Sequence, residues 1–150
     1  MDLAVPTEFK EFLRLLRVER VEYLLVGGWA VIYHGYSRPT NDFDIWIAVS
    51  EENAQRVARV FRKFGFDVAP PIAVFLESDR ILRIGNVPNQ IEIMTSASGV
   101  QFEDCFRERI ETTLDGEPVN LISLPNLRIN KRAAGRFKDL ADLEELPDAE

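Results

Sequence analysis

The sequence predicts an α/β or α+β fold built on a mixed β-sheet flanked by helices, and three observations indicate this class. Short apolar runs typical of buried strands alternate with segments whose apolar residues recur at helical spacing. Turn chemistry such as Asp115-Gly116 joins some strands directly, which argues against a purely parallel sheet. The 150 residues are enough for one sizeable core, so we expect a single domain over residues 1–150.

The N-terminal half is expected to alternate helices and strands. Thr7 can cap a first helix, and VEYLLV (residues 21–26) follows as a buried strand. Gly27-Gly28 breaks that strand, and WAVIYHG (29–35) predicts a short helix. DFDIWIAV (42–49) predicts a strand with alternating faces. Ser50 caps the next helix, which ends at Gly65.

The C-terminal half is expected to contain shorter elements. Strand-like pieces occur near residues 66–68, 72–76, 80–84 and 91–94, and residues 101–109 are expected to be helical. The runs IETTL and PVNLIS flank Asp115-Gly116 and predict a β-hairpin. Ser123 then caps a long C-terminal helix with Pro125 in its first turn.

Composition excludes several classes of protein. The net charge of −7 does not favour general attraction to nucleic acid. One cysteine, Cys105, cannot form an internal disulfide, and no Cys/His zinc pattern is present. No apolar run is long enough to span a membrane, and the N-terminus does not read as a signal peptide. We therefore expect a cytoplasmic protein.

Three carboxylates carry the chemical argument. Asp42 and Asp44 leave the same face of one strand, with Cβ atoms roughly 7 Å apart. If the carboxylates approached to about 4 Å they would repel by about 4 kcal/mol at an effective dielectric of about 20, unless a cation compensates them. Glu92, isolated in QIEIM, is expected to join them. Oxygen ligands alone favour Mg²⁺ or Mn²⁺, and three carboxylates can hold two ions. The alternative is an ion-pair network with Arg38 or Arg83.

The segment around the aspartates suggests an anion site. Gly27-Gly28 follows a strand and opens a helix, so backbone N–H groups can face a phosphate at close approach. The alternative is a plain strand-to-helix turn. Arg38 and Thr40 could contact a nucleotide or could simply order the loop before the strand.

The combined pattern resembles the nucleotidyltransferases of the DNA polymerase β superfamily. Val26-Gly27-Gly28 is followed by Asp42-Phe43-Asp44, and RPTNDFDI adds the context of small prokaryotic members. KRAAGRFKDLADLEEL is similar to the C-terminal helix of such proteins, including AbiE toxin relatives. The second glycine departs from the Gly-Ser that many active members carry, and Glu92 stands where the third acid is often Asp.

The resemblance implies transfer of a nucleoside monophosphate from an NTP, such as ATP, to a hydroxyl acceptor with release of pyrophosphate. Asp42, Asp44 and Glu92 would then be the catalytic and metal-binding residues, with Glu92 as general base. Gly27, Gly28, Arg38, Thr40, Lys131 and Lys138 would bind the nucleotide.

Lys131 and Lys138 are expected on one face of the long helix, with Arg136 turned aside, although a solvated charged face would explain these residues equally well.

The acceptor and the partners stay open. The acceptor could be tRNA, a partner protein or a small molecule, and a homodimer or a partner chain could complete the cleft. The alternative function is a non-catalytic binding or antitoxin module of the same fold, as in a toxin–antitoxin system. A purely structural domain would leave the three acids unexplained.

Overall fold

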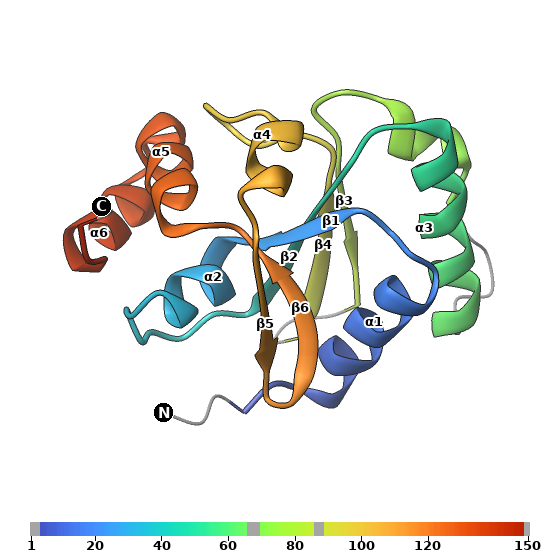
Figure 1. The fold of residues 1–150 in the computed structure, drawn as a ribbon, viewed down its shortest axis with the longest axis horizontal. Helices are drawn as coiled ribbons and strands as arrows, with labels where there is room; N and C mark the ends of the chain where they lie inside the picture. The colour runs from blue at the N-terminus through green and yellow to red at the C-terminus, as the bar shows by residue number, and fades with distance from the viewer. Residues whose placement is uncertain (1–3, 66–69, 86–88, 149–150) are drawn as a thin grey trace.

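The computed structural model describes residues 4–65, 70–85 and 89–148. It contains a central sheet surrounded by helices (Figure 1). The first half contains α1 (Thr7–Val18), β1 (Tyr23–Val26), α2 (Gly27–Tyr33), β2 (Asp42–Ile47) and α3 (Glu51–Phe64). The second half contains the 3₁₀ helix η1 (Ile72–Leu76), β3 (Ile81–Ile84), β4 (Gln90–Met94), α4 (Phe102–Arg107), β5 (Ile110–Leu114), β6 (Glu117–Leu121), α5 (Leu124–Ala134) and α6 (Phe137–Glu145). Within those ranges, no helix has both the length and the apolar character needed to cross a membrane.

The six strands form one sheet in the order β3-β4-β2-β1-β6-β5. β2 pairs parallel with β4 and antiparallel with β1, so the sheet is mixed, as the sequence predicts. β3 and β5 are antiparallel edge strands. The register places Asp44 opposite Val26 of β1 on one side and opposite Glu92 of β4 on the other. Motifs that lie far apart in the sequence therefore meet on neighbouring strands.

The two faces of β2 have different surroundings, because successive side chains of a strand point to opposite faces. Phe43 points into the core, where its ring stacks on Phe9 of α1 with 4.5 Å between centroids. On the opposite face, the Trp46 ring meets Phe102 of α4 edge-on at 5.3 Å. Asp44, on the same face as Trp46, lines a cleft. One face of β2 thus builds the core and the other contributes to the candidate site.

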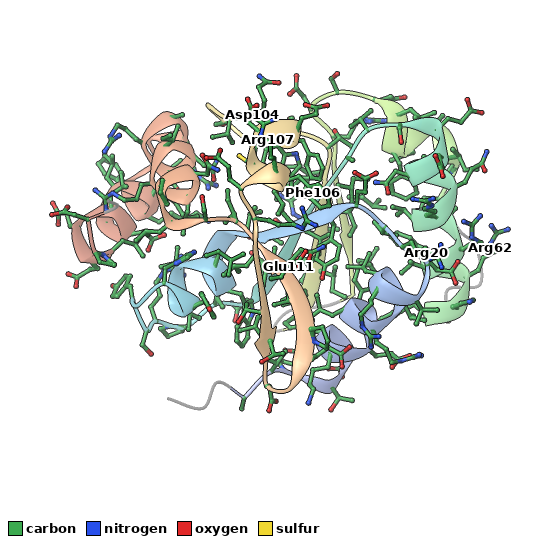
Figure 2. All side chains as sticks on the ribbon, in the orientation of Figure 1. Arg20, Arg62, Asp104, Phe106, Arg107 and Glu111 are labelled. Atoms are coloured by element: carbon green, nitrogen blue, oxygen red, sulfur yellow. The ribbon has the colours of Figure 1, made fainter. Side chains whose placement is uncertain are left out.

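Charged side chains of the peripheral elements lie on the outside of the molecule. Figure 2 labels Asp104 of α4 and Glu111 of β5, and it shows Arg62 of α3 at the edge of the molecule, pointing away from the ribbon. All three are exposed, as is usual for charged residues without a buried partner.

Several local signals act as predicted. The Ser50 and Ser123 hydroxyls accept hydrogen bonds from the backbone N–H groups of Asn53 and Asn126, so both serines cap their helices. Gly65 ends α3 in the left-handed conformation at φ 101°. The predicted hairpin is also present, with β5 and β6 paired antiparallel across Asp115-Gly116.

Two predictions, one about a helix cap and one about the type of an element, are wrong. Thr7 is the first residue of α1 and not its cap, because the Pro6 carbonyl already accepts the N–H groups of Phe9 and Lys10. Residues 72–76 form a 3₁₀ helix instead of a strand, since the Pro71 carbonyl accepts the Val74 N–H and starts a turn. The strand-like piece at 66–68 lies outside the described residues.

The predicted long C-terminal helix is two helices, α5 and α6. Gly135 adopts φ 66° and its N–H bonds to the Lys131 carbonyl, which closes α5 in the usual way for a glycine C-cap. Arg136 then caps the start of α6, where its backbone N–H and its Nε both donate to the Asp139 carboxylate. This break changes which charged residues of the C-terminal segment meet the sheet.

Candidate active site

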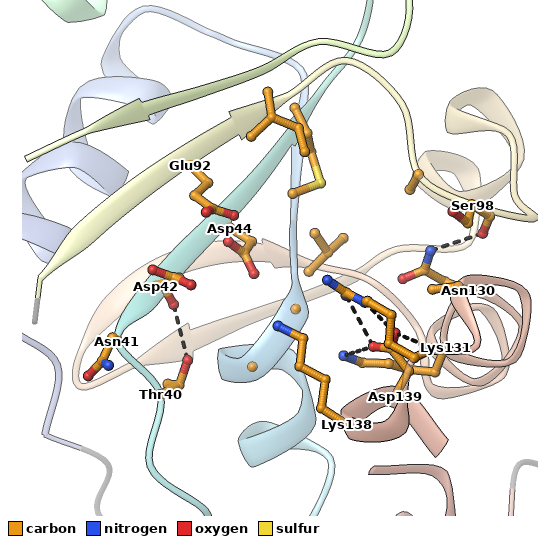
Figure 3. Close-up of a pocket in the computed structure, with 18 of the residues that line it drawn as sticks. Thr40, Asn41, Asp42, Asp44, Glu92, Ser98, Asn130, Lys131, Lys138 and Asp139 are labelled. Atoms are coloured by element: carbon orange, nitrogen blue, oxygen red, sulfur yellow. Dashed lines mark hydrogen bonds and ion pairs between the residues drawn. The ribbon is translucent and has the colours of Figure 1, made fainter. Parts of the chain in front are cut away.

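A cleft of about 700 Å³ opens along the polar face of the sheet. Its lining includes the turn between β1 and α2, the loop at residues 38–41, strands β2, β3 and β4, residues 96–98, and parts of α5 and α6. Figure 3 shows Asp42, Asp44 and Glu92 on one side of this cleft, with Lys131 and Lys138 across from them. We refer to this space as the cleft.

The three predicted carboxylates converge in the cleft. Asp42, Asp44 and Glu92 each offer an oxygen atom within 4.8 Å of the other two. The Oδ1 atom of Asp44 is buried and has no hydrogen-bond partner among the residues that the structure describes. Buried polar atoms are normally satisfied, so this oxygen calls for a further ligand. The predicted convergence of the acids is therefore present.

Mutual repulsion and burial make this cluster costly without a cation. Burial is the largest cause that raises the pKa of Asp44. The hydrogen bond to Glu92 and the negative charges of Glu92 and Asp42 raise this pKa further, to about 8. A divalent cation would compensate the same charges. An oxygen-only donor set, an unsatisfied buried oxygen and excess negative charge together fit an ion such as Mg²⁺ or Mn²⁺.

Glu92 also has a cationic neighbour, Arg83, which the sequence analysis gives as one of two possible ion-pair partners. Arg83 lies directly opposite Glu92 on edge strand β3, and its Nε is 2.8 Å from Glu92 Oε1. The Arg83 side chain is 58% exposed, whereas that of Glu92 is only 13% exposed. An exposed partner can leave more readily than a buried one, so this pair and a metal site are compatible.

The glycine turn lies directly against the carboxylates. Gly27 adopts φ 68°, and a Cβ atom there would lie 1.9 Å from Asp44 Oδ2. A Cβ on Gly28 would lie 2.5 Å from the Thr40 hydroxyl oxygen. Both contacts are shorter than atoms can approach, so side chains are excluded from this turn in the present arrangement. The close fit of Thr40 explains why a serine could not replace Gly28 here without displacing that hydroxyl.

Arg38 and Thr40 both line the cleft beside this turn. Arg38 donates two hydrogen bonds to Asp142 of α6, from Nε at 2.7 Å and from Nη2 at 2.9 Å. Among the residues that the structure describes, the Thr40 hydroxyl has only a long contact of 3.4 Å to the Asp42 carbonyl. Arg38 is therefore firmly oriented, whereas the Thr40 hydroxyl keeps most of its hydrogen-bonding capacity.

The structure corrects the expected geometry of Lys131 and Lys138. Their seven-residue spacing does not place them on one helical face, because the chain turns at Gly135 between them. Lys131 is buried, with Nζ 3.1 Å from both Asp139 and Asp142. Lys138 is exposed, and both lysines line the cleft although they belong to different helices.

Arg136 also lines the cleft and is not turned aside, again because it begins a second helix.

Sequence reasoning missed the buried role of Asp139 and Asp142. Both are at least 98% buried and share Lys131 between them. Burial disfavours the charged form of both carboxylates and raises their pKa values. Hydrogen bonds outweigh this effect and lower both pKa values, from Arg136 and Lys131 to Asp139 and from Arg38 and Lys131 to Asp142. Their spacing of three residues was a signal for a common helical face, yet it resembles any solvated charge run.

Comparison with known proteins supports the same fold. A crystal structure from Thermotoga maritima, of a protein provisionally described as a nucleotidyltransferase, matches with a TM-score of 0.60 at 17% sequence identity. The match covers 91% of this chain and 88% of that one, so it extends over most of both chains. A search among curated proteins gave no match.

The sequence itself matches a family profile over almost its full length. Residues 8–146 match the profile of aminoglycoside-2''-adenylyltransferase. This range includes the glycine turn, the three convergent carboxylates and both C-terminal helices. The chain belongs to the aminoglycoside-2''-adenylyltransferase family, within the nucleotidyltransferase fold.

Proposed function

We propose that the protein transfers a nucleoside monophosphate from an NTP to a hydroxyl acceptor and releases pyrophosphate, with ATP as the donor. The observation that carries this proposal is the convergence of Asp42, Asp44 and Glu92 directly beside the Gly27-Gly28 turn. The family name, which specifies adenylyl transfer, supports ATP as the donor.

The residues of the cleft suggest a division of tasks. Asp42 and Asp44, with Glu92, would hold Mg²⁺ or Mn²⁺; such ions, when bound, neutralise phosphate charge and lower the pKa of an attacking hydroxyl. The backbone N–H groups of Gly27 and Gly28 would bind the outer phosphates, because only a glycine turn leaves room for them so close to Asp44.

Other residues would complete the transfer. Glu92 would accept the proton of the acceptor hydroxyl, which places the base on the strand next to Asp44. Arg38 and Lys138 would neutralise phosphate charge from the opposite side of the turn, and the Thr40 hydroxyl would donate to a phosphate oxygen. Lys131 would act mainly by holding α6 in place, since its amino group already contacts two carboxylates.

The geometry also favours attack at the α-phosphate over the γ-phosphate. If the glycine turn holds the outer phosphates, the α-phosphate lies beside the carboxylates, where the base is also located. A phosphotransferase of the P-loop type would use a lysine in a Gly-rich loop, and Gly27-Gly28-Trp29 contains none.

One observation supports a second candidate function. The Arg83–Glu92 pair of 2.8 Å neutralises the third acid, as it would in a non-catalytic module that retains the fold for binding. Such a module could serve as a partner in a toxin–antitoxin pair. In this case the remaining aspartates would bind a cation and nucleotide without turnover.

The test follows the fate of each phosphate. Purified protein is incubated with ATP labelled at either the α or the γ position, in the presence of Mg²⁺ or Mn²⁺. Parallel reactions contain an aminoglycoside with a free 2''-hydroxyl, tRNA, or cell extract as the acceptor. The proposal predicts label transfer only from the α position and none with Asp42→Ala. Transfer from the γ position would indicate a kinase, and no transfer with any acceptor or any of the four NTPs would favour the non-catalytic module.

A further inference from the structure

A cluster of charged side chains, three of them buried, joins helix α6 to the loop before β2. We call it the α6 charge cluster, and it consists of Arg38, Lys131, Arg136, Asp139 and Asp142. Asp142 is 2% exposed and accepts hydrogen bonds from Arg38, which lies 104 residues earlier in the chain. Charges are placed in such an environment only when they are paired, so the cluster fixes the relative positions of its members.

Arg38 is held in a place where it can act on a ligand. Its Nη1 atom lies 3.4 Å from the position that a Cβ on Gly28 would occupy, so the guanidinium rests against the glycine turn. Nη1 donates a hydrogen bond to the Pro39 carbonyl, while Nε and Nη2 are bound by Asp142. Arg38 and Gly28 line the cleft, whereas Asp142 does not.

The charge of the cluster is suited to an anion. Three cations face two carboxylates, so the cluster carries one excess positive charge. All three of its cations, Arg38, Lys131 and Arg136, line the cleft where the proposed function places a polyphosphate. A planar guanidinium oriented by a bidentate carboxylate presents its remaining N–H groups in a fixed direction, unlike a free arginine.

We propose that Asp142 is a positioning residue that orients Arg38 toward the outer phosphates of a bound nucleoside triphosphate. The inference rests on the proposed function of the cleft. Asp142 does not touch the ligand and acts through Arg38 alone. Its removal should therefore weaken binding of ligands with β- and γ-phosphates, and leave binding of a nucleoside monophosphate unchanged.

The experiment measures the affinity of the full-length protein for ATP and for AMP by calorimetry in the presence of Mg²⁺. Asp142→Asn retains the shape of the side chain but removes its charge, and we expect ATP to bind roughly tenfold more weakly, as is usual when an orienting partner is lost. AMP affinity should stay within about twofold of the wild type. In the double variant with Arg38→Ala, ATP affinity should be no lower than with Arg38→Ala alone, because the two residues act as a unit.

Asp139→Asn is the matched control. Asp139 is equally buried and shares Lys131, but it contacts Arg136 instead of Arg38 and itself lines the cleft. We expect this variant to lose stability without the selective loss of ATP affinity. Equal losses in both variants would assign a purely structural role to Asp142 and would overturn the inference.

Two further outcomes are decisive. If Asp142→Asn does not fold, as judged by circular dichroism, Arg38→Lys provides the test, because it keeps the charge and removes the bidentate contact. Wild-type ATP affinity in Arg38→Lys, or in a folded Asp142→Asn, would overturn the inference while leaving the proposed function intact. Failure of the wild-type protein to bind either nucleotide would overturn both.

Discussion

Replacing Asp44 by asparagine should stabilise the metal-free protein, because this carboxylate is costly in the fold. Burial and the neighbouring acids raise the pKa of Asp44 from its ordinary 3.8 to about 8. For an acid whose pKa is raised by folding, stability is highest below the unfolded-state pKa and falls as the pH rises toward the folded-state value. The penalty therefore grows between about pH 4 and pH 8.

The size of the effect follows from this window. Each pH unit between the two pKa values costs about 1.4 kcal/mol, so the penalty at pH 7 is at most about 4 kcal/mol. Asp44→Asn removes it, and a gain of about 2–4 kcal/mol corresponds to roughly 5–10 °C in the melting temperature of a chain of this size. At pH 4 the variant and the wild type should melt within about 0.5 kcal/mol of each other.

The assay is thermal unfolding between pH 4 and pH 8, with and without Mg²⁺. Mg²⁺ at about 100 times its Kd should stabilise the wild type by about 2.7 kcal/mol and should have little effect on the stability of Asp44→Asn. Asp104→Asn is the control, because Asp104 is an exposed carboxylate on α4 paired only with Arg107 among the described residues. A loss of stability in Asp44→Asn, with Mg²⁺ binding intact, would refute the reasoning and favour a structural ion-pair network.

Three further variants test other parts of the site. Gly27→Ala should destabilise the protein well beyond the cost of about 1 kcal/mol expected for Gly116→Ala, since both glycines have positive φ but only Gly27 lacks space for a Cβ; equal melting temperatures would contradict the close approach to the carboxylate. Lys131→Met should cost about 3–5 kcal/mol in urea unfolding, because it leaves two buried aspartates with too few partners, whereas Lys138→Met should stay within about 0.5 kcal/mol. Arg83→Gln should increase Mg²⁺ affinity in calorimetry, since a competing cation leaves Glu92; a decrease would mean that Arg83 holds Glu92 in its binding position.

The parts of the fold that sequence predicts well are those with a local cause. Ser50 and Ser123 cap their helices because a hydroxyl next to an amphipathic run can accept a free N–H group within three residues. The shared face of Asp42 and Asp44 follows from strand geometry alone. The isolation of Glu92 between apolar residues predicts that it joins the two aspartates. The parallel register of β2 and β4 places Glu92 directly opposite Asp44.

The remaining features depend on distant contacts. A glycine can be tolerated inside a helix, so Gly135 alone does not indicate that the segment divides into α5 and α6, which pack against each other. The buried Asp142 pairs with Arg38 from the loop before β2, a contact that no local pattern indicates. Residues 72–76 contain only one buried side chain, Phe75, so their apolar run reflects a single anchor and not a strand.

The central claim is that Asp42, Asp44 and Glu92 form a metal centre that serves a nucleotide, and Mn²⁺ binding tests it most directly. Mn²⁺ is titrated into the protein and followed by electron paramagnetic resonance, with and without a non-hydrolysable ATP analogue. Wild-type protein and Asp104→Asn should bind Mn²⁺ with an affinity that rises when the analogue is present. Asp42→Ala combined with Asp44→Ala should abolish this binding while the protein stays folded. Equal Mn²⁺ binding in the double variant, or no binding by the wild type in the presence of the analogue, would contradict the account.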